Sequence, residues 1–145
     1  MRMPIESNER FMSSSNWRSR SVGVIVGDIR QGVYAALTSC LQASLEEIGC
    51  SVLVFNMQHR EDRLVAFLDR ARSLGLAAIV IAAPHLISPA TQKKILALSR
   101  SDLLTILYGQ ALEGERLFTI VEDDREMTAK AVNHLARAGR TPIAF

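Results

Sequence analysis

Short runs of uncharged, hydrophobic residues alternate along this chain with longer stretches in which hydrophobic residues recur every three or four positions. The first pattern is typical of strands buried on both faces of a sheet, and the second is typical of amphipathic helices. Five strands are predicted, at Val22–Val26, Ser51–Asn56, Ala77–Ala83, Leu103–Tyr108 and Leu117–Val121. The first four begin about 26 residues apart, a spacing that one strand–helix unit accounts for.

Helices are predicted after most of these strands. The first begins near Gln31 and ends at Gly49, and the second ends at Gly75, because glycine readily adopts the left-handed conformation that ends a helix. The third begins at Ser88-Pro89, where serine can cap the helix and proline fits its first turn.

The fourth predicted helix follows the fifth strand. Asp123 and Glu126 have the spacing of a capping box, with Asp123 as the cap. The hydrophobic residues that follow predict one buried stripe, formed by Met127, Ala131, Leu135 and Ala138.

This order of elements predicts the α/β class, as a three-layer αβα fold with a mainly parallel, twisted sheet. Residues 1–20 contain many serines and scattered arginines, and we expect a disordered tail or linker there. Residues 21–140 form the predicted folded unit. Residues 141–145 are predicted to begin another strand.

Charge and hydropathy limit the kinds of partner that we expect this chain to bind. The formal net charge of +2 comes from residues 1–21, and the other 13 basic and 13 acidic residues of the chain cancel. A neutral folded part provides no broad basic surface for nucleic acid. Because no hydrophobic run could span a bilayer or serve as a secretory signal, we expect no membrane partner and a cytoplasmic location.

Candidate site residues follow the strand ends, which meet at one edge of a parallel sheet, where ligands bind. Asp28, Asn56 and His85 come just after the first three strands, and Tyr34 lies early in the first helix. We expect hydrogen bonds to a ligand from the first two and ring stacking from Tyr34. The alternatives remain open: Asp28 as a helix cap, Asn56 as a turn residue, Tyr34 as core and His85 as a solvated side chain.

The chemistry of known catalytic motifs is missing. Gly27 and Gly32 have the spacing of a phosphate loop, but Val33 and Tyr34 stand where lysine and serine or threonine are needed. No dinucleotide fingerprint, catalytic triad or zinc-ligand spacing is readable. We therefore expect no enzyme, no cofactor and no metal.

Several segments in order resemble the effector-binding domain of the LacI/GalR family of transcription regulators. Val22–Asp28 resembles the family's opening "IGVIVPD", and Leu45–Gly49 resembles its "EEAGY". Ala77–Ala82 is similar to "DGIIL". The most specific stretch, Val121–Phe145, resembles "VDNxxGAxxAxxHLxxLGHRRIAF".

The resemblance implies a type I periplasmic-binding-protein fold, with a sugar or purine-like effector held between two subdomains, and a homodimer. It implies that 21–140 is the N-terminal subdomain and that 141–145 starts the crossover to a second subdomain absent here, so the fold is incomplete at the C-terminus. The family's ring-stacking aromatic falls on Tyr34 or Val33. Asp123 stands at the motif's aspartate and joins the candidate ligand contacts.

The sequence also departs from the family. Gly27 replaces its proline, Asp124 its asparagine and Gly109 an acidic residue after the fourth strand, so ligand specificity does not transfer. No helix-turn-helix is recognisable, and DNA binding is expected only through such a segment outside this chain. A solute-binding protein of the same fold, a dimerisation module without ligand and an unrecognised α/β enzyme are the alternatives.

Overall fold

The computed structural model describes residues 21–83, 87–101, 103–121 and 123–140. The strands are β1 (Ser21–Val26), β2 (Ser51–Asn56), β3 (Ala78–Ala82), β4 (Leu104–Tyr108) and β5 (Leu117–Ile120). The helices are α2 (Gly32–Glu47), α3 (Glu61–Arg70), α4 (Pro89–Ser99) and α5 (Asp124–Arg137). Each of the five predicted strands between 22 and 121 is present, with ends that differ from the prediction by at most one residue. The predicted tail at 1–20 and the predicted strand start at 141–145 lie outside the described residues.

The strands form one sheet in the order β2-β1-β3-β4-β5, and every neighbouring pair is parallel. The predicted parallel sheet is therefore confirmed. The register aligns the last residues of the strands in one row across the sheet: Asn56, Val26, Ala82, Tyr108 and Ile120. The loops that follow all five strands consequently leave the sheet at its carboxyl edge.

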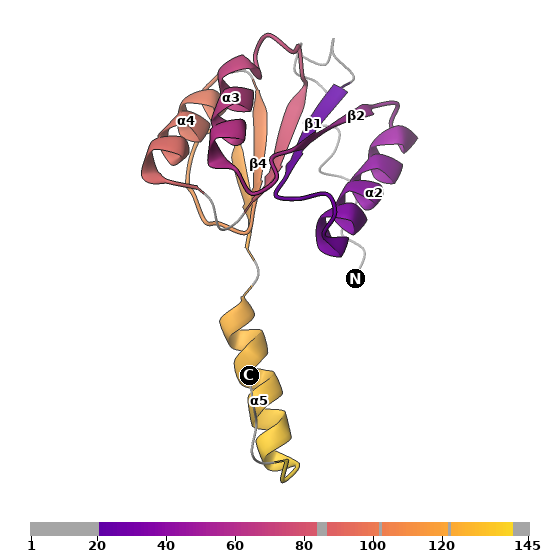
Figure 1. Ribbon diagram of the computed structural model, residues 1–145, viewed down its shortest axis with the longest axis vertical. Coiled ribbons are helices and arrows are strands. Elements are labelled where there is room, and N and C mark those ends of the chain that lie inside the picture. The colour runs from indigo at the N-terminus through magenta and orange to yellow at the C-terminus, as the bar shows by residue number, and fades with distance from the viewer. Residues whose placement is uncertain (1–20, 84–86, 102, 122, 141–145) are drawn as a thin grey trace.

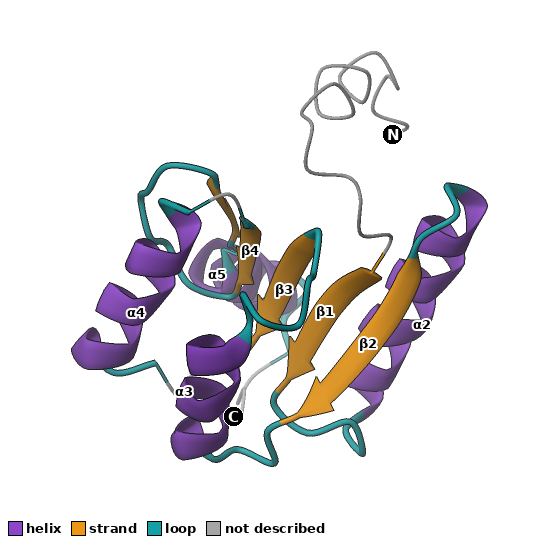
Figure 2. Ribbon diagram, turned by 90° about the horizontal axis from the view of Figure 1, so that it is seen from above, coloured by secondary structure: helices purple, strands orange, loops and turns teal. Residues whose placement is uncertain are grey.

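Alternating side chains of β1 enter two different hydrophobic clusters, one on each face of the sheet. Val24 belongs to a cluster with Tyr34 and, half-buried, Leu37 and Leu41 of α2. Ile25 belongs to the other cluster, whose helical members come from α3 and α4. Figure 2 shows α2 on one side of the sheet and α3 and α4 on the other, which confirms the predicted three layers.

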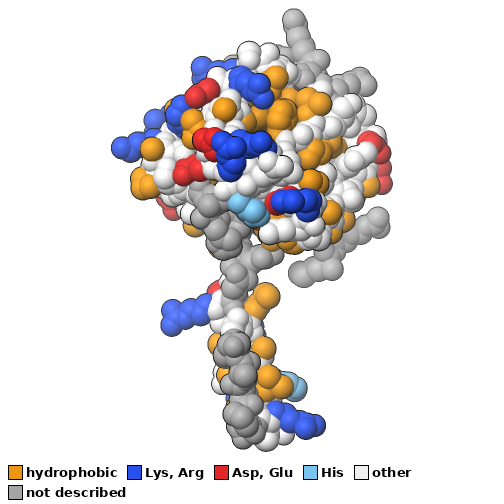
Figure 3. Space-filling model, viewed as in Figure 1, with side chains coloured by type: hydrophobic (Ala, Val, Ile, Leu, Met, Phe, Trp, Pro, Cys, Tyr) orange, Lys and Arg blue, Asp and Glu red, His pale blue; other side chains and the backbone are white. Residues whose placement is uncertain are grey.

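The fourth predicted helix forms, but its stripe is not buried. Met127 is 62% exposed and Leu135 is 39% exposed, and Ala131 and Ala138 are exposed as well. Figure 1 shows the reason: α5 leaves the carboxyl edge and extends away from the sheet and from α2, α3 and α4. Figure 3 shows hydrophobic side chains along one side of this helix. The prediction of a buried stripe is therefore wrong for the described residues.

The edge strand β2 is exposed more than the strands beside it. Leu53 and Val54 are 43% and 44% exposed, whereas Val24 and Ile25 of the neighbouring strand are buried. In Figure 3 hydrophobic side chains gather at the surface over β1 and β2, between α3 and α2. The sheet thus presents a hydrophobic edge on this side.

Candidate functional site at the carboxyl edge of the sheet

Backbone hydrogen bonds continue the sheet into the loops after β1 and β2. Gly27 N–H donates to the carbonyl of Ala82 at 3.1 Å, and Met57 N–H donates to Val26 at 3.0 Å. His59 N–H then donates to Gly27 at 2.8 Å. These bonds join the β1–α2 loop to the β2–α3 loop, so the polar residues of both loops share one surface.

Asp28 lies in the β1–α2 loop with its side chain only 6% exposed. Its carboxylate accepts the backbone N–H of Arg30 at 3.0 Å and holds the guanidinium through Nε at 3.0 Å and Nη2 at 2.6 Å. The hydrogen bonds from Arg30 hold the pKa of this carboxyl well below its usual range. Asp28 is not the cap of α2, because Gln31 occupies that position.

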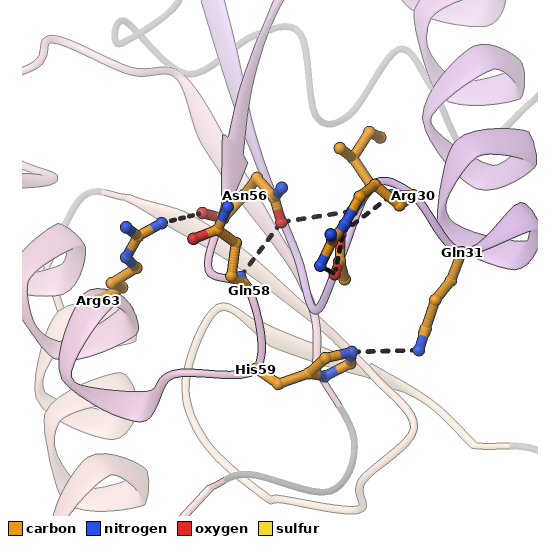
Figure 4. A network of polar contacts seen from close by, with 8 residues as sticks. Arg30, Gln31, Asn56, Gln58, His59 and Arg63 are labelled. Atoms are coloured by element: carbon orange, nitrogen blue, oxygen red, sulfur yellow. Dashed lines mark hydrogen bonds and ion pairs between the residues drawn. The ribbon is translucent and has the colours of Figure 1, made fainter.

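Asn56, the last residue of β2, ties the same two loops together. Its Oδ1 accepts the N–H of Ile29 at 3.3 Å and the N–H of Gln58 at 3.2 Å, and Figure 4 shows the first of these bonds crossing from one loop to the other. Asn56 therefore acts as a turn residue and also sets the distance between the loops. Whether it contacts a ligand remains a prediction.

The β2–α3 loop contains two further polar residues that the sequence did not single out. Gln58 and His59 have φ angles of 52° and 55°, in the left-handed region, which for residues with side chains costs about 1–3 kcal/mol each and is often found at functional sites. The His59 ring reaches the α2 cap, with Nε2 at 3.1 Å from Nε2 of Gln31 (Figure 4). The loop was recognisable in the sequence as polar, but its backbone conformation was not.

Tyr34 is buried rather than open to solvent. It is 7% exposed and packs in the α2-side cluster, and burial raises the pKa of its hydroxyl. A Cβ at Gly27 would lie 2.9 Å from both Cε2 and Oη of this ring. The core alternative is thus what the structure shows, and ring stacking on a ligand remains a prediction.

The remaining candidates are Asp123 and His85. Asp123 is exposed and caps α5, accepting the N–H of Glu126 at 2.8 Å. In a complete capping box the side chain of Glu126 would accept the N–H of Asp123. Here it forms an ion pair with Lys130 at 2.7 Å instead. His85 lies outside the described residues. A ligand contact by either residue is untested.

A new candidate stands two residues after β4. Oε1 of Gln110 is buried and lacks a hydrogen-bond partner among the described residues. Buried acceptors of this kind are rare, because leaving one unpaired costs about 1–3 kcal/mol. Gln110 therefore adds an unused acceptor to the row of strand ends, which only the fold reveals.

A side-chain clamp fixes the start of α4 against the start of α3. The carboxylate of Glu61 accepts the N–H of Ser88 at 2.8 Å and the hydroxyl of Thr91. These hydrogen bonds lower the pKa of Glu61. Since Ser88 also caps α4, as predicted, the clamp holds both helix starts at the carboxyl edge.

A groove of about 400 Å³ lies beside the hydrogen-bonded β1–α2 and β2–α3 loops (the network), on the side of α3. Phe55 and Phe67 line it together with Asn56, and Arg63 and Arg70 of α3 contribute charged side chains. Arg63 also donates to the carbonyl of Asn56 at 3.4 Å. The network thus borders a concave, partly hydrophobic surface.

No group of histidine, cysteine and acidic side chains suited to hold a metal occurs within residues 21–83, 87–101, 103–121 and 123–140. In the same residues no helix combines the length and hydrophobicity required to cross a membrane.

The parallel sheet between two layers of helices places the chain in the class of three-layer α/β domains. Residues 19–145 match the family described as periplasmic binding proteins and the sugar-binding domain of the LacI family. The chain belongs to this family, and the resemblance noted in the sequence is confirmed. No curated protein sequence matches the chain.

Solved structures with the same fold include LacI-family regulators. A putative ribose operon repressor from Burkholderia thailandensis has a TM-score of 0.71 at 18% identity, over 84% of this chain and 45% of that one. A LacI-family regulator from Lactobacillus casei with bound sucrose has a TM-score of 0.67 at 16% identity, over 82% and 42%.

The Cra regulator from Pseudomonas putida, in complex with fructose 1-phosphate, has a TM-score of 0.67 at 18% identity, over 83% of this chain and 43% of that chain. The chain therefore spans less than half the length of these structures. At such identities the likeness establishes the fold alone.

Proposed function

We propose that this chain is part of the effector-sensing domain of a LacI-type transcription regulator, and that its effector binds at the carboxyl edge of the sheet. One observation carries the proposal: Asp28, Asn56 and His59 come from two loops that hydrogen bonds join into one polar surface. Small molecules bind at this edge in open α/β sheets. The family match supports a binding role over catalysis, and we propose no enzymatic activity.

A sugar or a purine-like molecule is the proposed effector. The regulators of the same fold that hold sucrose and fructose 1-phosphate support the sugar class. A regulator of this kind acts on DNA in the cytoplasm, and its DNA contacts would come from a helix-turn-helix outside these residues. Asn56, His59 and Gln110 are the proposed polar contacts, and Asp28 is proposed to support the site through its bonds to Arg30. Tyr34, His85 and Asp123 remain secondary candidates.

The test is calorimetry on the full-length protein with a panel of sugars, sugar derivatives and purines. We expect one class to bind and to change the protein's affinity for its operator. Asn56→Ala should weaken that binding about tenfold or more, because the loops lose a shared acceptor whose bonds contribute roughly 0.5–1.5 kcal/mol each. Gln42→Ala, an exposed change on α2, is the control. Absence of binding across the panel would contradict the proposal.

A solute-binding protein of the same fold is the second candidate, because the matched family includes periplasmic binding proteins. The two functions differ in their second partner. Ligand binding with no sequence-specific DNA binding by the full-length protein would favour this alternative.

A homodimer is proposed as the assembly, and a dimerisation module that binds no ligand is the third candidate. The hydrophobic edge at β2, with Leu53 and Val54 exposed, supports an interface.

A further inference from the structure

The guanidinium of Arg30 is fixed in place yet open to solvent. Its side chain is 79% exposed, whereas the Asp28 side chain that holds it is 6% exposed. Nε and Nη2 meet the carboxylate, so the N–H groups of Nη1 are not used in this pair. A planar, oriented guanidinium with unused N–H groups suits a phosphate or carboxylate, which it can meet through paired hydrogen bonds.

The acceptors beside Arg30 are already occupied. Asp28 accepts from Arg30, and Oδ1 of Asn56 accepts two backbone N–H groups. The hydroxyls of a neutral sugar donate as well as accept, and need acceptors to receive their hydrogens. This part of the edge therefore presents donors, which favours a ligand group that only accepts.

His59 adds to the same side of the network. It is exposed, lies beside Gln31 and is held by its own backbone bond to Gly27. As assigned, Nε2 of Gln31 donates to the ring, so the ring's other nitrogen carries a hydrogen that can be donated. Gln58 and His59 both have a left-handed backbone, and both are exposed.

The unused acceptor lies further along the sheet. Gln110 follows β4, which is separated from β1 by β3 alone, so the strand axes are about 10 Å apart. One end of the edge offers donors and the other a buried acceptor.

We infer that the effector is an anionic sugar derivative, a sugar phosphate or a sugar acid, whose anionic group binds Arg30 and His59. The inference rests on the proposed function and names the ligand class for its site. Asp28 acts as a positioning residue: its carboxylate holds the guanidinium of Arg30 in place and does not itself contact the ligand.

The experiment is calorimetry on the full-length protein with phosphorylated hexoses and pentoses, aldonic acids and their neutral parent sugars. We expect an anionic member to bind at least about tenfold more tightly than its neutral parent. Tighter binding of the sugar phosphates would identify a phosphate as the anionic group, and tighter binding of the aldonic acids would identify a carboxylate. Raising the salt concentration should weaken the anionic ligand selectively.

Variants assign the effect to the named residues. Arg30→Gln should reduce affinity for the anionic ligand about 10- to 100-fold, as expected for a hydrogen bond to a charged group, and should leave the neutral parent's affinity nearly unchanged. His59→Asn is the second variant, since asparagine tolerates the left-handed backbone and the side chain is exposed. Arg72→Gln, at an exposed arginine in the turn after α3, is the matched control.

The outcomes separate the inference from the function it rests on. Tight binding of a neutral sugar, with equal losses for charged and neutral ligands in Arg30→Gln, would overturn the inference and leave effector sensing intact. If Arg72→Gln reduced the affinity for the anionic ligand as much as Arg30→Gln does, the inference would also be overturned. The loss would then reflect the net charge of the protein and not a contact with Arg30. No binding by any member would overturn the inference, and only a further absence of binding by the purines would contradict the proposed function as well.

Discussion

At the scale of single residues, the most informative contact is that between Gly27 and Tyr34. The tyrosine ring fills the space that a side chain at Gly27 would need, with Cε2 and Oη 2.9 Å from the position of a Cβ. Tyr34 thereby supports the first loop of the candidate site from inside the core. The glycine that stands in place of the family's proline is thus explained by packing.

Gly27→Ala is expected to destabilise the protein by about 1–3 kcal/mol, the usual cost of overpacking a core. The ring of Tyr34 must move, and the β1–α2 loop with it. Gly32→Ala is the control, because a Cβ there meets no atom within 4 Å and alanine favours the helix start. Thermal unfolding of both variants measures the difference. Equal melting temperatures would show that the ring shifts without cost.

At the scale of elements, α5 differs from the other helices. The helices α2, α3 and α4 bury one side against the sheet, whereas α5 extends beyond the carboxyl edge with its stripe exposed (Figure 1). Helices of this length gain most of their stability from packing, so α5 depends more on its cap. Asp123 supplies that cap at 2.8 Å from the N–H of Glu126.

Substitution of Asp123 separates a capping role from a ligand role. Asp123→Ser retains a capping oxygen, and we expect full helicity and full effector binding if the cap is what matters. Asp123→Ala should reduce the stability of α5 by roughly 0.5–2 kcal/mol. Circular dichroism and calorimetry measure the two properties. Loss of effector binding in the serine variant, at unchanged helicity, would instead establish Asp123 as a ligand contact.

At the scale of the whole molecule, the two edges of the sheet are the surfaces open to association. An exposed, hydrophobic edge strand promotes pairing with another chain unless a partner covers it. The exposed hydrophobic residues are Leu53 and Val54 at β2 and Phe118 and Ile120 at β5, and the groove lined by Phe55 and Phe67 adjoins β2. We therefore expect the proposed homodimer to form through β2.

Val54→Lys is predicted to weaken the dimer at least about tenfold, because a lysine in a hydrophobic interface must be desolvated. Thr119→Lys, an exposed residue of the opposite edge strand β5, is the matched control. Sedimentation of the full-length protein measures the dissociation constant. A stronger effect at Thr119 than at Val54 would place the interface on the other edge.

The order of elements was determined by the sequence, because hydrophobic runs, helix caps and glycine ends are local signals. The five strands, the caps Ser88 and Asp123 and the parallel sheet all follow from them. Because these signals are local, the sequence predicted the helix α5 but not its exposed position. A stripe of hydrophobic residues shows that a helix has a side to bury, but not what lies against that side.

Only the tertiary structure determined the chemistry of the edge. The sequence placed Asp28 and Asn56 there, since strand ends converge in any parallel sheet. Which of their atoms are occupied depends on how each loop folds: Arg30, two residues further on, occupies the Asp28 carboxylate, and Oδ1 of Asn56 accepts the N–H of Ile29 from the other loop. Burial of Asp28 and the bonds from Asn56 to Ile29 and from Gln31 to His59 depend on packing between segments distant in the sequence, which local patterns do not specify. This packing leaves Arg30 and His59 exposed beside the two expected acceptors.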